Sequence, residues 1–532
     1  DVCSSDLEIM KHTQIDFWYL RKIQRIIDCE KELSHYTWPE IPIEILQKAK
    51  RFNISDIRIA ELVGTSAKEL RSLYKKLGIK PAYKLVDTCA GEFEAVTPYY
   101  YSTWQGQDEV KMNSDSKKIL VIGSGPIRIG QGVEFDYCSV HAAWAVKQLG
   151  FQAVVINNNP ETVSTDYSVA DRLYFEPLAL EDVLSVIEKE KVAGVLIQFG
   201  GQTAINLANA LKDEGILIYG TTPENIDKME DREQFYHVLN ELNIPHILGH
   251  IVHSLEGLSE SVYELGFPVL IRPSYVIGGQ SMFICNSDKE LYHYVSRIQK
   301  DTNDKCWPLL IDQYLPGAEC EVDVISDGEN IVIPGIFEHI EKAGVHSGDS
   351  MSVFPPVTMP DKVKELIVEY STKISRKVPI IGMMNIQFVY YQDVLYVLEV
   401  NPRSSRTVPF LSKVTGIPMI EWAVNAQFGT SLKEMTNNLG LLKEPNYFTI
   451  KAPIFSANKL KGVDHVLGPE MKSTGEIIGV GHSKNEALKK VTSSIGKVGN
   501  IKRLFVSVSD RLKEECIPII KVFEKGGVEI IA

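Results

Sequence analysis

The sequence has 532 residues, of which 44% are hydrophobic and 23% are charged. These values are typical of a globular protein with several domains, each able to bury a core of its own. A net charge of −13 argues against nucleic acid as the main partner of the whole chain. No apolar run approaches the roughly 18 residues that a membrane span requires. The eight cysteines show no C-x-x-C pair and no zinc-ligand spacing, so we expect free thiols and a reducing, cytoplasmic location. No charged segment followed by an apolar stretch opens the chain, so we expect no export signal.

The first seven residues (1–7, DVCSSDL) resemble the translation of a sequencing-adapter oligonucleotide. We expect this segment to be non-native and exclude it from the prediction of the fold. On this interpretation the natural N-terminus is missing, and Cys3 carries no information.

Residues 8–113 are predicted to be helical. Apolar side chains recur there at helical spacing, namely at Phe17, Trp18, Leu20, Ile23, Ile26 and Ile27. Ser66 and Glu69 form a capping box, and Gly78 supplies the end of the helix that the box opens. The stretch 57–77 also resembles a helix-turn-helix. Nine Lys or Arg against three Asp or Glu between Leu46 and Lys80 leave DNA binding as an alternative to a solvated basic face.

From Lys117 the pattern changes to strands alternating with helices. Strands are predicted at 118–123, 153–157 and 192–198, and helices between them at 133–149 and 180–190. Such alternation is typical of a doubly wound parallel sheet.

Beyond residue 233 the predicted strands come in closer pairs, such as 321–326 with 331–336, which indicates an antiparallel α+β domain. A last strand at 503–508 opens a strand-helix-strand unit that ends at Ala532. Because one such unit cannot bury a core, we expect the C-terminal domain to be truncated. No internal repeat is evident.

A glycine-rich turn follows the first of these strands, from Gly123 to Gly132 (GSGPIRIGQG). Glycines let backbone N–H groups approach an anion at a helix N-terminus, although a simple tight turn or an ordinary dinucleotide site remains an alternative. Pro126 and Arg128 interrupt the dinucleotide fingerprint, and the second strand ends in a polar loop, 157–166, rather than in an acidic residue.

A second glycine motif, 271–279 (IRPSYVIGG), joins Arg272 to the pair Gly278 and Gly279. Arginine makes forked contacts with phosphate, and paired glycines allow a loop to close over it. The same pattern is compatible with a plain β-turn.

The segment 385–403 is predicted to be a hairpin with its turn near Asp393. A register centred on Asp393 sets Gln387 opposite Glu399, and strand alternation puts Asn401 on the same face as Glu399. Three oxygen ligands would then converge, which suits Mg²⁺. Two arginines beyond the hairpin, Arg403 and Arg406, could bind an anionic substrate. An edge hairpin with outward polar residues is the alternative.

His346 lies in the loop 343–350 (AGVHSGDS) and is interpreted as a binding-loop residue. No Ser-His-Asp or Cys-His arrangement is evident. We therefore predict that the chain has no glutamine-hydrolysing centre.

Six segments, in order, closely resemble large chains of carbamoyl-phosphate synthase of bacterial type. They are GPIRIGQGVEFDYCSVHA, NNPETVSTDYSVADRLYFEP, QFGGQTAINLA, IRPSYVIGGQ, EHIEKAGVHSGDS and LEVNPRSSRTVPF. The resemblance covers residues 8–532 and implies an ATP-grasp fold with two similar halves in the family. The first half phosphorylates bicarbonate, which ammonia converts to carbamate, and the second phosphorylates carbamate. VDTCAGEFEAVTPYYYSTW resembles the end of the oligomerisation domain between the halves, so the half present here is the second.

The resemblance also implies roles for individual residues. Arg232 and Arg272 would hold nucleotide phosphates under a lid that contains Gly278 and Gly279. The nucleotide pocket would be completed by Gln313, Leu315, Glu319, Gly344, Val345, His346 and Ser347. Gln387, Glu399 and Asn401 would coordinate Mg²⁺ or Mn²⁺, and Arg403 and Arg406 would face carbamate and the transferred phosphoryl group. The implied cofactors are ATP and one of these cations, with K⁺ as a further candidate.

The fold class expected from this resemblance is α/β. The expected parts are the C-terminal part of a helical oligomerisation domain (8–113), a doubly wound pre-ATP-grasp subdomain (117–233), an ATP-grasp domain (234–425), the end of the carbamoyl-phosphate synthetic domain (426–500) and a truncated allosteric α/β domain (501–532). The implied partners are a small glutamine amidotransferase subunit and the missing first half, in a homo-oligomer of heterodimers without nucleic acid or membrane. Allosteric effectors, and the choice between arginine and pyrimidine synthesis, stay open.

Two other functions compete with this one. Another ATP-grasp enzyme, such as a biotin carboxylase, would need a biotin-carrier partner, and residues 8–113 fit that family poorly. A DNA-binding or purely structural oligomerisation protein is the alternative from a different class. Stabilisation by MgATP in a thermal-shift assay would favour the enzyme.

Overall fold

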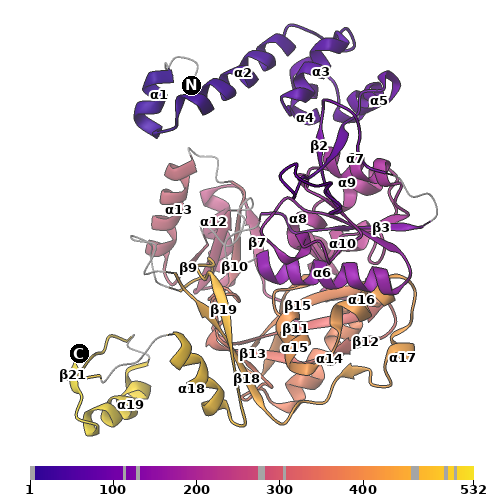
Figure 1. The fold of residues 1–532 in the computed structure, drawn as a ribbon. Helices are drawn as coiled ribbons and strands as arrows, with labels where there is room; N and C mark the ends of the chain where they lie inside the picture. Colours follow the sequence, from indigo (N-terminus) through magenta and orange to yellow (C-terminus); the bar gives the residue numbers. More distant parts are fainter. Residues whose placement is uncertain are drawn as a thin grey trace. The chain divides into compact units, whose positions relative to one another are not determined.

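The computed structural model describes residues 6–111, 116–126, 132–273, 282–302, 307–456, 467–495, 501–508 and 512–532. The chain forms two compact units, and each is assembled from separate stretches of sequence (Figure 1). Unit 1 comprises Asp1–His250, Glu319–Ile336 and Met359–Lys443, and unit 2 comprises Ile251–Ala318, Phe337–Thr358 and Glu444–Ala532. Among the described residues, no helix is both long enough and apolar enough to cross a membrane.

Five helices form the N-terminal part of unit 1. They are α1 (Asp6–Thr13), α2 (Phe17–Leu33), α3 (Ile43–Arg51), α4 (Asp56–Val63) and α5 (Ala67–Leu77). The predicted capping box is confirmed, because the Ser66 hydroxyl accepts from the Glu69 N–H while the Glu69 carboxylate accepts from the Ser66 N–H. Gly78 ends α5 with φ of 70°, a left-handed conformation that glycine adopts without strain.

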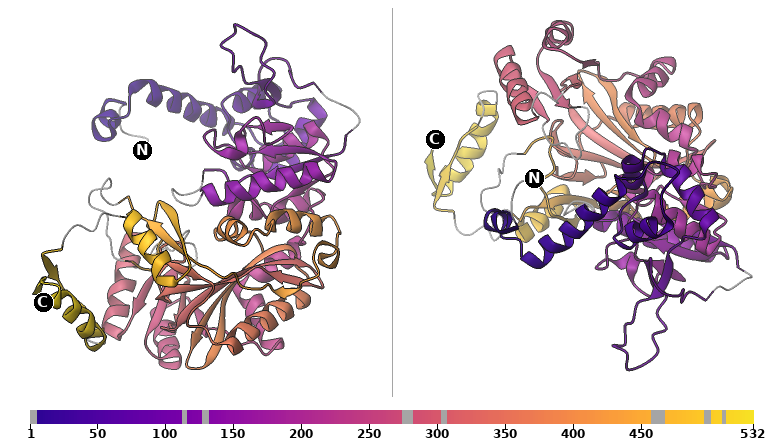
Figure 2. Two further views of the ribbon diagram at one scale, coloured as in Figure 1. Left: turned by 60° about the horizontal axis from the view of Figure 1, so that its bottom comes forward. Right: turned by 90° about the horizontal axis from the view of Figure 1, so that it is seen from above.

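The prediction of helix as far as residue 113 is wrong beyond α5. Two strands, β1 (Ala82–Leu85) and β2 (Tyr99–Thr103), pair antiparallel there, and β2 pairs in parallel with β5 (Arg172–Tyr174). Three consecutive tyrosines in β2 favour a strand. The neighbouring strand β5 supplies a pairing partner for β2, and a search for helical periodicity does not detect such a partner. The segment between β1 and β2 extends from the sheet as a long loop (Figure 2).

The basic helical pair α4 and α5, with the end of α3, contacts acidic elements of the same unit. Lys50 lies 2.7 Å from Asp56 and 3.2 Å from Glu181 and is only 3% exposed. Arg71 lies 2.6 Å from Glu214. These basic residues therefore form ion pairs within the chain.

The parallel sheet predicted from residue 117 onwards is confirmed. Its strand order is β1-β2-β5-β4-β3-β6, with β3 (Lys118–Ile122), β4 (Gln152–Ile156) and β6 (Gly194–Leu196) all parallel to their neighbours. The helices that accompany it are α6 (Gly132–Gln148), α7 (Leu180–Glu190), α8 (Gly201–Ile205), α9 (Ala208–Asp213), α10 (Pro223–Glu230) and α11 (Arg232–Glu241). β5 was not predicted from the sequence.

The rest of unit 1 is built around a second group of strands. Its order is β16-β15-β11, with β12 paired antiparallel to β11 and β17 parallel to β12. The strands are β11 (Ala318–Asp327), β12 (Ile331–Ile333), β15 (Ile381–Tyr391), β16 (Val394–Asn401) and β17 (Gly440–Leu441). The predicted pairing of 321–326 with 331–336 is confirmed at Ile325 opposite Val332 and Ser326 opposite Ile331.

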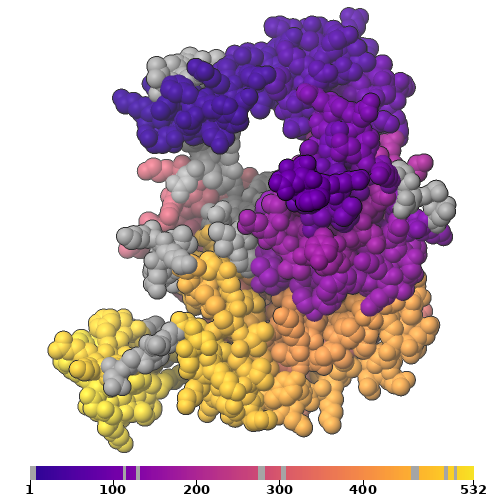
Figure 3. Space-filling model, viewed as in Figure 1, coloured from indigo at the N-terminus to yellow at the C-terminus, as the bar shows by residue number. Residues whose placement is uncertain are grey.

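Helices cover these strands and join them to the parallel sheet. They are α14 (Asp361–Lys377), α15 (Val408–Thr415), α16 (Met419–Gln427) and α17 (Leu432–Met435). α15 and α16 pack against α6, and the space-filling view shows the orange part of unit 1 adjoining its purple part (Figure 3).

Unit 2 contains two antiparallel groups of strands and a separate C-terminal element. The first group, β7-β10-β8-β9, consists of β7 (Gly249–Val252), β8 (Val269–Pro273), β9 (Phe283–Cys285) and β10 (Leu309–Gln313), with α12 (Leu255–Leu265) and α13 (Asp288–Thr302). The second, β13-β14-β18-β19, consists of β13 (Ile336–Lys342), β14 (Ser352–Phe354), β18 (Phe448–Ile454) and β19 (Gly475–Gly481), with α18 (Lys484–Ile495). The predicted strand-helix-strand at the end of the chain is present as β20 (Arg503–Phe505), α19 (Lys513–Lys525) and β21 (Glu529–Ile531).

Candidate active site

The hairpin β15–β16 sets Gln387 opposite Glu399, as predicted, but the register of the two strands differs from the predicted one. The turn residues Gln392 and Asp393 both have positive φ, 48° and 61°, so the loop is a two-residue turn. The register then shifts by one residue between Gln387 and Phe388. This β-bulge, rather than an uninterrupted register centred on Asp393, brings Gln387 opposite Glu399.

A chain of side-chain hydrogen bonds runs from Glu399 to Arg403. The Asn401 amide nitrogen donates to Oε1 of Glu399 (3.0 Å), and Nη2 of Arg403 donates to Oδ1 of Asn401 (3.2 Å). Partial burial lowers the pKa of Arg403, an effect opposed by the negative charges of Glu399 and Glu230 and reinforced by Arg406. The hairpin thus brings the predicted metal ligands and Arg403 together.

The hydrogen-bond chain continues to two residues for which the sequence predicted no role. Nε of Arg403 donates to Oε1 of Gln202 on α8 (3.2 Å), and the Gln202 amide nitrogen donates to Oε1 of Glu230 (2.9 Å). Gln202 lies in the quoted motif QFGGQTAINLA, and Glu230 immediately precedes Asp231 and Arg232. The only sequence signal was their place inside motifs, since neither residue lies near the hairpin in the chain.

We call residues 402–407 the arginine loop, because it carries Arg403 and Arg406. A buried carboxylate on β11 holds its second half: Oδ2 of Asp323 accepts from the hydroxyls of Ser405 (2.8 Å) and Thr407 (2.5 Å). Burial, with Glu321 close by, raises the pKa of Asp323 to about 6, although these hydrogen bonds act in the opposite direction. Asp323 therefore fixes the backbone from which both arginines project.

The first half of the loop is held by Gln198, which follows β6 and is fully buried. Its amide nitrogen donates to the carbonyl oxygen of Pro402 (2.9 Å), and its backbone oxygen accepts from the N–H of Ser404 (3.0 Å). Its amide oxygen accepts from the N–H of Met383 (3.3 Å) and from the side chain of Gln427. One side chain therefore connects the parallel sheet to the arginine loop.

The glycine-rich turn after β3 is described only in part. The Gly125 N–H donates to Oδ1 of Asn157 (3.0 Å), and a Cβ on Gly123 would lie 2.8 Å from Asn157. These two glycines therefore make room for the side chain of Asn157, which anchors the polar loop at the end of β4. Arg128 and Gly130 lie outside the described residues.

Arg232 opens α11. Its Nε and Nη2 donate to the Tyr236 hydroxyl (3.0 and 2.7 Å), and the Tyr236 ring stacks on His246 with 4.2 Å between centroids. These contacts order the guanidinium that is predicted to bind phosphate.

The other predicted nucleotide contacts, apart from Glu319 at the start of β11, belong to unit 2. Tyr314, between Gln313 and Leu315, donates its hydroxyl to the carbonyl oxygen of Ala343 (2.5 Å). A Cβ on Gly344, whose φ is 105°, would lie 2.9 Å from the Tyr314 ring. The predicted loop Gly344, Val345, His346 and Ser347 therefore begins against the end of β10, next to Gln313 and Leu315.

Two further features of unit 2 bear on the predictions. Nε of Arg272, on β8, is buried and has no hydrogen-bond partner among the described residues, as expected of a group that awaits an anion. Nδ1 of His346 accepts from the Gly348 N–H (3.1 Å), so this histidine shapes its own loop. Gly278 and Gly279, predicted for the lid, lie outside the described residues.

Glu399 with the amide oxygens of Gln387 and Asn401 is a donor set that suits Mg²⁺ or Mn²⁺. In the structure the amide nitrogen of Asn401 faces Glu399 and its oxygen accepts from Arg403, so the oxygen would reach a cation shared with Glu399 only after the amide turned. Within the described ranges, no group of three His, Cys, Asp or Glu side chains could hold a metal. The predicted set differs from such a group because it combines one carboxylate with two amide oxygens.

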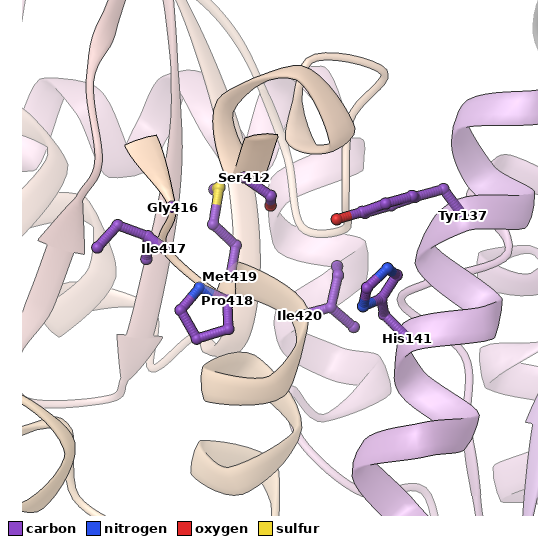
Figure 4. Close-up of a pocket in the computed structure, with 8 residues that line it drawn as sticks. All are labelled: Tyr137, His141, Ser412, Gly416, Ile417, Pro418, Met419 and Ile420. Carbon is purple, nitrogen blue, oxygen red and sulfur yellow. The ribbon is translucent and has the colours of Figure 1, made fainter. Parts of the chain in front are cut away.

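A pocket of about 120 Å³ lies between α6 and the α15–α16 connection, lined by Tyr137, His141, Ser412 and residues 416–420 (Figure 4). The hydroxyl of Tyr137 points toward Ser412, and the imidazole of His141 lies beside Ile420 (Figure 4). Burial lowers the pKa of His141, and the positive charge of Lys413 acts in the same direction. No predicted site residue lines this pocket.

Three family models match the chain. Residues 115–228 match "Carbamoyl phosphate synthase preATP-grasp domain", residues 231–435 match "Carbamoyl-phosphate synthase L chain, ATP binding domain", and residues 4–78 match "Carbamoyl-phosphate synthetase large chain, oligomerisation domain".

Among curated proteins, the carbamoyl phosphate synthase large chain of Clostridium acetobutylicum is 48% identical over 99% of this chain and 49% of its own length. That of Clostridium perfringens is 48% identical over 98% of this chain and 49% of its own. The chain thus spans about half the length of these relatives.

Solved structures show the fold. The biotin carboxylase domain of Hydrogenobacter thermophilus 2-oxoglutarate carboxylase superposes with a TM-score of 0.55 at 18% identity, over 72% of this chain and 90% of that one. Biotin carboxylase from Campylobacter jejuni gives 0.54 at 17% identity, over 71% and 90%. At these identities the likeness concerns the fold alone, and it confirms the predicted α/β ATP-grasp architecture.

Proposed function

The chain belongs to the carbamoyl-phosphate synthase large-chain family, and from this premise we propose that it carries the ATP-dependent phosphorylation of carbamate to carbamoyl phosphate. The observation that carries the proposal is the hydrogen-bonded series Glu399, Asn401 and Arg403 beside the arginine loop. It combines a donor set for a divalent cation with a fixed guanidinium, which are the elements that phosphoryl transfer needs.

The assignment to the carbamate-phosphorylating half is supported by the order of the matched segments. The oligomerisation-domain match, 4–78, precedes the pre-ATP-grasp match at 115–228. In the proposed parent protein the first ATP-grasp half lies before this domain and phosphorylates bicarbonate. The parent would make carbamoyl phosphate from bicarbonate, two ATP and ammonia that a small glutamine amidotransferase subunit releases.

In the proposed reaction a carbamate oxygen attacks the γ-phosphorus of ATP, and carbamoyl phosphate and ADP form. Arg403 and Arg406 would hold carbamate and the transferred phosphoryl group, since a guanidinium matches the geometry of both anions. Gln387, Glu399 and Asn401 would hold Mg²⁺ or Mn²⁺, which neutralises charge on the phosphates. Arg232 and Arg272 would bind the remaining phosphates.

The nucleotide base and ribose would be bound by Gln313, Leu315, Glu319 and the loop 344–347. Closure of the segment that contains Gly278 and Gly279 would exclude water from carbamate, which is labile. We place the parent protein in the cytoplasm as a homo-oligomer of heterodimers; six cysteines of the described residues are free thiols, which is consistent with a reducing compartment.

The test is the reverse reaction, because formation of ATP from carbamoyl phosphate and MgADP needs this half alone. We expect ATP formation by the chain and its loss in Arg403→Met. Failure of a folded, nucleotide-binding sample to make ATP would refute the proposal. ATPase activity that depends on bicarbonate, without ATP formation, would instead indicate the bicarbonate-phosphorylating half, and bicarbonate-dependent carboxylation of biotin a biotin carboxylase.

A further inference from the structure

Gln202 contacts Arg403 although 201 positions separate them in the chain. Its amide nitrogen donates to Oε1 of Glu230 (2.9 Å) and to Oδ1 of Asn206 (2.9 Å). An amide nitrogen only donates and an ionised carboxylate only accepts, so Glu230 fixes which end of the amide faces Arg403. The oxygen of Gln202 is therefore directed at Nε of Arg403.

The guanidinium of Arg403 is held from three other directions. Nη1 donates to the carbonyl oxygen of Ser404 (3.2 Å), Nη2 donates to Asn401 (3.2 Å), and the group lies 5.7 Å from the centroid of the Phe135 ring. Three of its five N–H donors are used in this way. One N–H on each terminal nitrogen remains available to an anion.

These contacts differ in what they require of the site. The contact with Asn401 would be lost if that amide turned its oxygen toward a cation beside Glu399. The contact with Gln202 is made by a different nitrogen, Nε, and does not depend on that rotation. Gln202 is also accessible to solvent, so the contact lies at the surface at which a ligand arrives.

We propose that Gln202, oriented by Glu230, is a positioning residue for phosphoryl transfer that acts by holding the guanidinium of Arg403. The inference rests on the proposed function and deepens it. A displacement of about 1 Å in a group that binds the transferred phosphoryl costs as much as 10²-fold in rate. Gln202 acts on the rate through Arg403 and contributes little to the binding of the nucleotide.

The first experiment measures ATP formation by three variants. Gln202→Met keeps the length of the side chain and removes both hydrogen bonds, so kcat should fall about tenfold to a hundredfold, while KM for MgADP changes less than about twofold. Exchanging the pair, Gln202→Glu with Glu230→Gln, restores an acceptor for Arg403 and a donor between the two positions, so most of the rate should return. Gln24→Met is the matched control, since Gln24 also donates to a residue four positions on, Asp28, but on an exposed helix.

A second comparison separates positioning from a general structural role. In an Arg403→Lys background Gln202→Met should cost less than about threefold, because the group on which it acts is absent. Loss of the same factor in both backgrounds, or parental kcat in the single variant, would overturn the inference.

Hydrogen–deuterium exchange provides a readout that needs no activity. Peptides that cover residues 401–406 should exchange faster in Gln202→Met than in the parent or the exchanged pair. If the parent makes no ATP, the proposed function fails and the role in phosphoryl transfer fails with it, whereas ATP formation by the parent with unchanged exchange at 401–406 in Gln202→Met rejects the positioning role alone.

Discussion

Replacement of Gln198 by methionine should loosen the arginine loop. The change keeps a side chain of similar length but removes all of its hydrogen bonds. It leaves at least two buried groups without their partner, the carbonyl oxygen of Pro402 and the amide nitrogen of Gln427. Each such loss costs about 1–3 kcal/mol, so local opening should become easier by about 2–6 kcal/mol.

Local opening is measured by hydrogen–deuterium exchange, since a chain with two units does not give a single free energy of unfolding. A loss of about 2 kcal/mol corresponds to roughly 30-fold faster exchange. The effect should appear in peptides that cover 381–384 and 402–404, the two segments that Gln198 joins, and ATP formation should fall with it. Gln24→Met should change neither segment. Parental exchange in both segments of folded Gln198→Met would refute the reasoning.

Three further changes test other parts of the structure. Glu399→Gln keeps the shape of the side chain but removes the charge that would neutralise Mg²⁺, so ATP formation should fall about 10²-fold or more. Excess Mn²⁺ should partly restore ATP formation by Gln387→Ala. A near-parental rate in folded Glu399→Gln over a metal titration would reject the metal site. Burial raises the pKa of Glu176 to about 7, above roughly 4.3 in an unfolded chain. The folded state therefore holds the proton of Glu176 more tightly than the unfolded state does. The stability that this proton contributes is fully present below about pH 4.3 and is lost as the pH rises through 7. Glu176→Gln should therefore flatten the dependence of the urea midpoint on pH between 4.5 and 8, and an unchanged slope would contradict the assignment. Lys50→Met leaves two carboxylates unpaired at a buried site, which costs about 3–5 kcal/mol of stability. Limited proteolysis should therefore release the helical segment 8–78 faster than in Lys48→Met, whose ion pair with Glu32 is exposed. Equal rates of release would show that the buried ion pair does not hold this segment.

The sequence predicted elements best where one strong local signal defined them. The capping box at Ser66, the buried strands β3 and β4, and the long helices α6 and α7 follow directly from side-chain pattern. The pairing of Gln387 with Glu399 was also predicted, although the β-bulge that produces it was not. A bulge is a property of both strands and of their turn together, and alternation within one strand does not reveal it.

The helical prediction for residues 78–113 failed for a related reason. β1 and β2 are strands because β5, some 70 residues later, offers β2 a parallel partner. Buried polar contacts were missed in the same way. Asp323 has no unusual neighbours in the sequence, and its role as acceptor for Ser405 and Thr407 exists only when β11 packs beneath the arginine loop.

The two glutamines of the segment QFGGQ explain why the arginine loop lies where it does. The side chain of Gln198 donates to the backbone of the arginine loop at Pro402. Gln202, four positions on, accepts from the guanidinium of Arg403. The glycines between them make this possible. A Cβ on Gly200 would lie 2.4 Å from the carbonyl oxygens of β3 and the turn after it, and Gly201 has φ of 64° with the Phe135 ring 3.1 Å from its Cβ position. Only glycines let the chain turn this tightly from strand into helix, so the spacing of the two glutamines is set by the turn, and the turn brings α8 to the ring against which the arginine lies.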